Sequence, residues 1–192
     1  MEVCIGVKRI EKPFEIVSPP VADCNSIMVR KAIDTADHDV IISVFMKALI
    51  QRVSSAQVDV DGHVVGKIGR GLLVFLCAVR DDADEDLDYI VKKVSRLRIF
   101  GDAQGKMNLS VLDIKGEALV VSQFTLAAAT RKGNRPSFDE AEAPDRAKEM
   151  YEAFIERLKG TGIGVQAGVF AAMMNVALVN DGPVTIWLDS RE

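Results

Sequence analysis

The chain has 192 residues, 48% of them hydrophobic and 27% charged, which is typical of a globular protein with one domain or one domain and an appendage. This composition excludes wholesale disorder and collagen-like repeats, and the longest apolar run, residues 40–50, is interrupted by Lys47 and too short to span a membrane. Because the net charge is −4, any contact with nucleic acid must depend on a local basic patch.

Three scattered cysteines, Cys4, Cys24 and Cys77, form no C-x-x-C pair and no cluster with histidine. The sequence therefore predicts neither a disulfide framework nor a structural zinc site, and we expect no metal and no cofactor. This use of cysteine favours a reducing, cytoplasmic setting.

Residues 1–45 differ in character from the rest of the chain, because they show no clean helical or alternating periodicity. They lack the basic and apolar regions of a secretory signal, and their seven acidic and five basic residues are the wrong balance for a transit peptide. We expect an N-terminal extension over residues 1–45, either disordered or upstream of the true start, and one domain over residues 46–192.

In chain order, the first predicted strand covers residues 47–53. Residues 57–65 alternate and contain Asp61-Gly62, which predicts a hairpin because both turn residues adopt positive φ. The continuous apolar run over residues 72–79 predicts a buried strand. Asp81-Asp82 are then expected to cap a helix whose apolar residues recur at i, i+3, i+4 and i+7.

After a loop over residues 100–107, the segments 110–114 and 118–124 are expected to form a second hairpin around Lys115-Gly116. Pro144 is expected to begin a second helix. The last predicted features are a polar loop over residues 130–137, a helix end at Gly160 and Gly162, a turn over 180–183 and a strand over 184–188. Together they predict a single α/β domain with a layered, mixed and largely antiparallel sheet, sandwich- or barrel-like, and two main helices.

Histidine is scarce, which limits the possible chemistry. A Ser-His-Asp or Cys-His mechanism needs an imidazole beside the nucleophile, but His38 lies in the N-terminal extension and His63 at a hairpin turn. No Gly-rich nucleotide-binding motif is present either. If the chain is an enzyme, its chemistry does not rest on the usual catalytic side chains.

Three segments are candidates for function. Polar and aromatic side chains crowd the end of a buried strand over Ser122–Leu126, where they serve either a ligand or the capping of the core. The cations of residues 131–136 suggest phosphate contact, although a solvated basic loop is the alternative. Residues 180–185 contain Gly182-Pro183, which is either a functional element or a plain turn.

Seven segments in consistent order resemble the bacterial and eukaryotic D-aminoacyl-tRNA deacylase family. They are Gln51–Val53, Gly69–Val74, Arg98–Phe100, Gly105–Asn108, Ser122–Leu126, Gly133–Phe138 and Asn180–Thr185. The resemblance covers residues 46–192. Since Met46 resembles a family N-terminus, we expect translation to start there and residues 1–45 to be a gene-model artefact.

The resemblance implies a homodimeric carboxylic ester hydrolase that proofreads aminoacylated tRNA. Such an enzyme cleaves the ester of a D-amino acid on tRNA, or of glycine wrongly attached to an alanine tRNA. A cis Gly182-Pro183 element would enter the pocket of the partner subunit and exclude L-amino acids with its backbone carbonyls. Arg52 would hold this element in place.

The resemblance also assigns the pocket. Ser122, Gln123 and Thr125 would position the substrate, and the substrate-binding residues would be Phe124, Phe170 and Met174. Catalysis would rest on the 2′-hydroxyl of the terminal ribose, with Thr125 as nucleophile the alternative. The lack of a nearby base argues against that alternative.

The cations Arg131, Lys132 and Arg135 are the expected tRNA phosphate contacts. Two other function classes remain open, a nucleic-acid-binding module without catalysis and an amino-acid-binding dimer without turnover. Net acidity and the lack of interleaved aromatic and basic residues disfavour the first.

Overall fold

The computed structural model describes residues 45–131 and 133–190, so the predicted N-terminal extension lies outside the described residues. The first hairpin joins β1 (Lys47–Val60) and β2 (His63–Ile68). Asp61 and Gly62 adopt φ values of 50° and 78°, which confirms the predicted turn. β1 is longer than predicted, because the adjacent exposed residues Ser54 and Ser55 interrupt the alternation at a shift in register with β8.

β1 lies at the centre of the sheet, antiparallel to three other strands. Its first half pairs with β3 (Gly71–Cys77) and its second half with β2, while β8 (Asn175–Asp189) runs along its other edge. The sheet continues from β3 to β6 (Glu117–Ser122) and β7 (Gly164–Ala167) in parallel. The predicted mixed sheet is thus confirmed.

The sheet is nearly closed into a barrel, and Gly66 of β2 lies where it closes. A Cβ atom at this position would lie 2.9 Å from Leu119 Cδ1 and 3.0 Å from the Ala167 carbonyl oxygen. β2 therefore folds over β6 and β7 so closely that the contact requires a residue without a side chain.

The predicted hairpin around Lys115-Gly116 is wrong. The Asp113 carboxylate accepts hydrogen bonds from the Ser110 backbone N–H at 2.8 Å and from the Ser110 hydroxyl at 2.7 Å. This local side-chain bonding stabilises a turn in place of a strand. β6 consequently has parallel partners on both sides.

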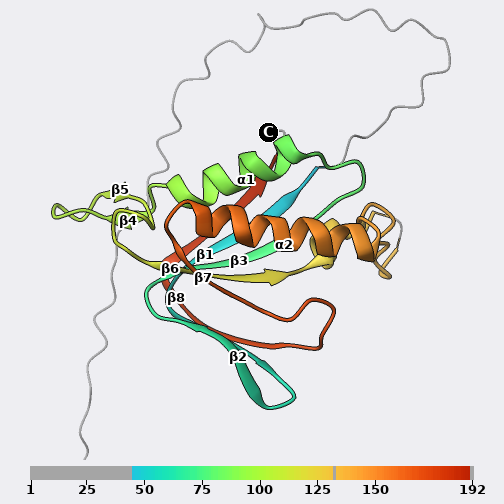
Figure 1. Cartoon of the computed structure of the whole chain (residues 1–192), viewed down its shortest axis with the longest axis horizontal. Helices are drawn as coiled ribbons and strands as arrows, with labels where there is room; N and C mark the ends of the chain where they lie inside the picture. Colours follow the sequence, from blue (N-terminus) through green and yellow to red (C-terminus); the bar gives the residue numbers. More distant parts are fainter. Residues whose placement is uncertain (1–44, 132, 191–192) are drawn as a thin grey trace, which may run out of the picture. The chain divides into compact units, whose positions relative to one another are not determined.

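The helices α1 (Asp84–Arg96) and α2 (Pro144–Gly160) pack against the same face of the sheet (Figure 1). Pro144 begins α2 as predicted. The predicted cap of α1 is wrong, because the N-cap is Ala83 and its N–H donates to Asp86 Oδ2 at 2.9 Å. Asp82 Oδ2 instead accepts from the Val79 N–H at 2.7 Å.

Three apolar clusters form the core, and the smallest consists of Cys77, Val79 and Ala127. Of the other two, one lies between the helices and the sheet and contains Phe100, Phe154 and Ile50, and the other fills the barrel side with Leu73 and Leu119. The remaining short elements are β4 (Phe100–Gly101), β5 (Met107–Leu109) and the 3₁₀ helix η1 (Phe124–Ala127). In the described ranges, no helix has the length and apolar character needed to cross a membrane.

Candidate active site

The segment predicted to form the pocket lies where β6 leaves the sheet. Ser122 is the last residue of β6, and the N–H of Gln123 donates to the carbonyl of Leu76 in β3 at 2.7 Å. The chain then turns into η1, where Gln123 Nε2 donates to Thr125 Oγ1 at 2.5 Å. Ser122 is half-buried and Thr125 is exposed. The end of β6 therefore presents a group of polar side chains.

Phe124 remains 56% exposed although it follows a buried strand. Its ring packs edge-on against Phe138, with 5.0 Å between the centroids and an interplanar angle of 69°. The contact leaves most of the Phe124 ring open to a ligand beside Ser122 and Thr125.

The basic loop that precedes Phe138 lies at the same end of the sheet. Backbone hydrogen bonds between Ala129 and Ser137, at 2.8 and 3.0 Å, close this loop. Arg131 and Arg135 are both exposed in it. Lys132, the third predicted phosphate contact, lies outside the described residues.

Phe170 and Met174 lie on the segment that follows β7, beside the second half of β6. The Gly168 N–H donates to the Val120 carbonyl at 2.9 Å, and the buried Tyr151 hydroxyl donates to the Val120 and Gly168 carbonyls at 2.9 and 3.2 Å. Phe170 packs against Tyr151 with 5.9 Å between ring centroids. Tyr151 thus fixes the segment that carries Phe170.

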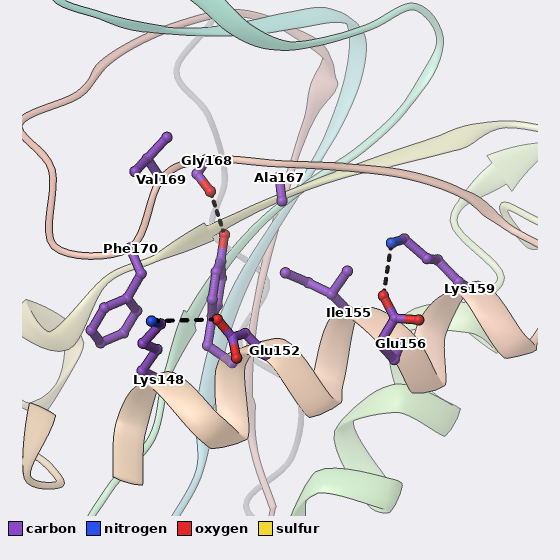
Figure 2. A pocket seen from close by; sticks show the side chains of 10 residues that line it. Lys148, Glu152, Ile155, Glu156, Lys159, Ala167, Gly168, Val169 and Phe170 are labelled. Atoms are coloured by element: carbon purple, nitrogen blue, oxygen red, sulfur yellow. Dashed lines mark hydrogen bonds and ion pairs between the residues drawn. The ribbon is translucent and has the colours of Figure 1, made fainter. Parts of the chain in front are cut away.

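A groove of about 650 Å³ lies between α2 and residues 167–170. Figure 2 shows the side chains that line it. Phe170 lines this groove, but none of the residues 122–125 does. Ion pairs between Lys148 and Glu152, at 3.8 Å, and between Lys159 and Glu156, at 2.8 Å, lie along its helical side. The groove is therefore a neighbour of the polar strand end and is separate from it.

Gly182 and Pro183 project from a large bulge in β8. Val53 of β1 faces Asn180 and Gln51 faces Thr185, so two steps along β1 correspond to five steps along β8. The extra residues form an exposed loop, and its Gly182–Pro183 peptide bond is cis, as the resemblance implies. The predicted turn is therefore a loop inside one long strand.

Arg52 anchors this loop from the middle of β1. Its Nε donates to the Asp181 carbonyl at 2.7 Å and lies 3.4 Å from the Asp181 carboxylate, and its Nη1 donates to the Ile99 carbonyl. Gly182 has a φ of 145°, and a Cβ there would lie 2.8 Å from both Arg52 Nη2 and Val184 Cγ2. A residue with a side chain at position 182 would therefore be strained and would crowd the Arg52 side chain.

The pocket segment and the Gly182–Pro183 loop lie at different levels along the strands of the sheet. Along β3, Leu72 faces Arg52 whereas Leu76 faces Ser122, a separation of about 13 Å at about 3.3 Å per residue. One subunit therefore brings Ser122–Thr125 together and joins Arg52 to Gly182–Pro183, but it does not unite the two groups.

Among the described residues, no histidine lies beside Ser122–Thr125 to act as a base. His63 is exposed at the hairpin, where its Nδ1 lies 3.0 Å from the Asp61 carbonyl oxygen, while His38 lies outside the described residues. Within residues 45–131 and 133–190, no three His, Cys, Asp or Glu side chains are placed to hold a metal ion. Burial raises the pKa of Tyr151 to about 12, so its hydroxyl stays protonated as a donor.

Alkaline pH should destabilise the domain through Cys77, which is buried and donates to the Phe124 carbonyl at 3.6 Å. Burial raises the pKa of this thiol from 9.0 to about 11. Between these values the unfolded chain binds fewer protons than the folded chain, so the free energy of unfolding falls, by up to about 3 kcal/mol. Between pH 8 and 11, the free energy of unfolding measured in urea should fall less steeply for Cys77→Ala than for the wild type. An equally steep fall in both proteins would contradict this.

Comparison with known proteins identifies the family. A D-aminoacyl-tRNA deacylase of Persephonella marina is 60% identical over 146 residues, which are 76% of this chain and 99% of the relative. One of Aquifex aeolicus is 57% identical over 147 residues, 77% of this chain and 99% of the relative. The family model described as D-Tyr-tRNA(Tyr) deacylase matches residues 49–189. The chain belongs to the D-aminoacyl-tRNA deacylase family.

Solved structures agree with the deacylase fold. A protein described as a c-Myc DNA unwinding element binding protein is 41% identical, with a TM-score of 0.72, and covers 76% of this chain and 99% of its own. A probable eukaryotic D-amino acid tRNA deacylase is 19% identical, with a TM-score of 0.68, over 76% of this chain and all of its own. The second likeness concerns the fold alone.

Two structural supports of the site escaped the sequence reasoning. Tyr151 lies on the helix that Pro144 begins, and its one signal in the sequence is a hydroxyl among apolar helix residues, which needs a partner when buried. The Ile99 carbonyl that receives Arg52 has no signal in the sequence, because any residue supplies a carbonyl oxygen.

Proposed function

We propose that this chain hydrolyses the ester between a D-amino acid and the terminal ribose of tRNA, and thereby proofreads translation in the cytoplasm. Residues 46–192 would form the catalytic domain. The observation that carries the proposal is the anchored, exposed Gly182–Pro183 loop in a chain 60% identical to a D-aminoacyl-tRNA deacylase. Ser122, Gln123 and Thr125 position the ester, while Phe124, Phe170 and Met174 bound the pocket.

The enzyme acts as a homodimer in which each subunit completes the pocket of the other. The separation of about 13 Å between the two groups, from the strand rise, supports this arrangement because a partner must supply the missing loop. An apolar row also crosses the sheet face away from the helices, from Phe75 through Leu49 to Trp187, and Trp187 is 42% exposed. Such a row is suited to a two-fold interface.

Chirality is selected by sterics. The backbone carbonyls of Gly182–Pro183 exclude the side chain of an L-amino acid from one face of the pocket, and they need no charged group to do so. Glycine has no side chain on either face. It therefore passes, and glycine attached to an alanine tRNA becomes a second substrate.

The chemical step uses the 2′-hydroxyl of the terminal ribose. This assignment is supported by the surroundings of Thr125 and Ser122, where no described imidazole is within reach to act as a base. The pocket's contribution is to hold the ester in a productive orientation.

One assay tests the proposal. Purified protein is incubated with D-tyrosyl-tRNA and, separately, with L-tyrosyl-tRNA, and ester loss is followed over time. We expect rapid loss of the D-ester and near-background loss of the L-ester. Equal loss of both, or loss of neither, would contradict the proposal.

A second candidate is nucleic-acid binding without turnover, favoured by the relative of 41% identity whose description names binding to a DNA element. The same assay separates the two functions. A binding module would retain tRNA on a filter while leaving the D-ester intact.

A further inference from the structure

A second group of cations lies far from the loop that holds Arg131 and Arg135. Residues 92–115 contain six basic and two acidic residues, a net charge of +4 in a chain of net charge −4. Arg70 adds a seventh cation. The group, called here the basic end, consists of Arg70, Lys92, Lys93, Arg96, Arg98, Lys106 and Lys115, all of them exposed.

Contacts tie the basic end into one surface. Arg70 lies 5.6 Å from the centroid of the Phe100 ring in β4. Arg98 donates through Nε and Nη2 to the backbone carbonyl and the side-chain oxygen of Asn108, at 2.8 and 2.9 Å. Lys106 lies in the connection between β4 and β5, which projects beside the last turn of α1 in Figure 1. Gly116, next to Lys115, is held close to the Arg70 carbonyl.

The charges of the basic end are offset only in part by nearby carboxylates. Hydrogen bonds from Asn108 and Ser110, and then the charge of Arg98, lower the pKa values of Asp102 and Asp113. None of its seven side chains forms an ion pair with a described carboxylate, whereas Lys148, Arg157 and Lys159 on α2 all do. The two acidic side chains nearby also accept hydrogen bonds within the turns that contain them. Asp102 accepts from the backbone N–H groups of residues 104 and 106, and Asp113 accepts from Ser110.

A dipole explanation covers only part of the group. Cations in the last turns of α1 favour the negative end of the helix, so Lys93 and Arg96 have a structural reason to be there. Arg70, Lys106 and Lys115 lie on other elements and have no such reason. Several exposed cations on adjoining elements are typical of a surface that binds a polyanion.

The basic end is joined to the Gly182–Pro183 loop. Arg52 donates to the Asp181 carbonyl on one side and to the Ile99 carbonyl on the other, and Ile99 lies between Arg98 and β4. Because Arg52 connects the two features, the basic end must lie near the Gly182–Pro183 loop in any assembly. In the proposed dimer, this places the basic end at the mouth of the partner's pocket.

We propose that the basic end binds the sugar-phosphate backbone of a tRNA whose aminoacylated end occupies the pocket of the partner subunit. This inference rests on the proposed function. The pocket subunit contributes Arg131 and Arg135, and its partner contributes the Gly182–Pro183 loop together with the basic end. One tRNA then contacts both subunits.

The test compares two substrates and two matched variants. D-tyrosyl-tRNA carries the phosphates, whereas 3′-O-D-tyrosyl-adenosine carries the ester, its ribose and the adenine base but no phosphate. The variant Lys106→Ala/Lys115→Ala removes two exposed charges of the basic end. The control Lys67→Ala/Lys159→Ala removes two exposed charges elsewhere, and thermal unfolding of both variants verifies that they fold.

We expect the basic-end variant to lose about tenfold in kcat/KM for the tRNA and nothing for the adenosine ester. The slope of log(kcat/KM) against log(salt) should become shallower by about 1 to 2, because each lost phosphate contact removes about one counterion. The control variant should match the wild type. If the wild type cleaves both D-esters and the basic-end variant keeps the wild-type kcat/KM for the tRNA, the inference alone is overturned. A wild type that cleaves neither would overturn the proposed function.

Mixed dimers test the assignment to the partner. One subunit carries Ser122→Trp to block its pocket, so only the other pocket works. Placing Lys106→Ala/Lys115→Ala on the blocked subunit should reduce turnover of the tRNA, whereas placing it on the subunit with the open pocket should not. The reverse result would show that each subunit uses its own basic end and would overturn the assignment.

Discussion

Replacing the terminal ribose of D-tyrosyl-tRNA by 2′-deoxyribose is expected to slow hydrolysis by about 1,000-fold or more, while Thr125→Ala retains activity within about tenfold. The reason lies around Thr125, whose hydroxyl accepts a hydrogen bond from the Gln123 amide at 2.5 Å. An amide donor withdraws electron density from that oxygen and cannot remove its proton. The measurement is single-turnover hydrolysis of the normal and deoxy substrates by both proteins.

The control is Thr125→Ser, which keeps a hydroxyl in place of the threonine side chain. If Thr125 were the nucleophile, serine would restore the activity that alanine abolishes, and the deoxy substrate would still be cleaved. That pair of results, with unchanged thermal unfolding, would move the chemistry from the RNA to the protein.

Arg52→Ala should reduce the preference for D- over L-tyrosyl-tRNA by about 100-fold, since displacing a positioning group by about 1 Å costs about that much. The guanidinium joins the Asp181 and Ile99 carbonyls, and alanine leaves both without this donor. The free energy of unfolding should fall by about 1–3 kcal/mol, because the Arg52 side chain is only 14% exposed. The readouts are kcat/KM for both esters and urea unfolding.

Lys47→Ala is the matched control, because Lys47 lies on the same strand, is 15% exposed and pairs with Glu140 at 3.9 Å. It should lower stability without altering the ratio of D- to L-ester cleavage. A similar loss of selectivity in both variants would mean that general loosening of β1 is the cause, and it would remove Arg52 from the selection mechanism.

Several local signals in the sequence predicted the local structure, although the expected Asp81-Asp82 cap was wrong. Asp61-Gly62 determines its own turn, and Pro144 determines the start of α2, because each acts on adjacent backbone. The run over residues 72–79 is apolar enough to predict a buried strand, and β3 is that strand. The family motifs added the pocket segment and the loop, whose matched residues all lie between positions 49 and 189.

Non-local pairing was beyond the sequence. Residues 110–124 contain two apolar segments on either side of Lys115-Gly116, as a hairpin would, but the pairing of β6 with the distant strands β3 and β7 decides the outcome. The same holds for the site, where Arg52 and Ile99 are 47 positions apart. No periodicity encodes a contact between a guanidinium and a carbonyl at such a separation.

The β8 bulge has a further consequence for selectivity. The two ends of the loop, Asn180 and Thr185, pair with Val53 and Gln51 of β1. Asn180 also closes the loop by accepting a hydrogen bond from the Val184 N–H at 2.8 Å. Its conformational entropy is therefore lost when the chain folds, and a substrate need not order it again. In the proposed enzyme, a filter held in this way would meet both enantiomers in the same shape. Discrimination would then belong to the docking step, and L-esters would behave as poor binders instead of slow substrates.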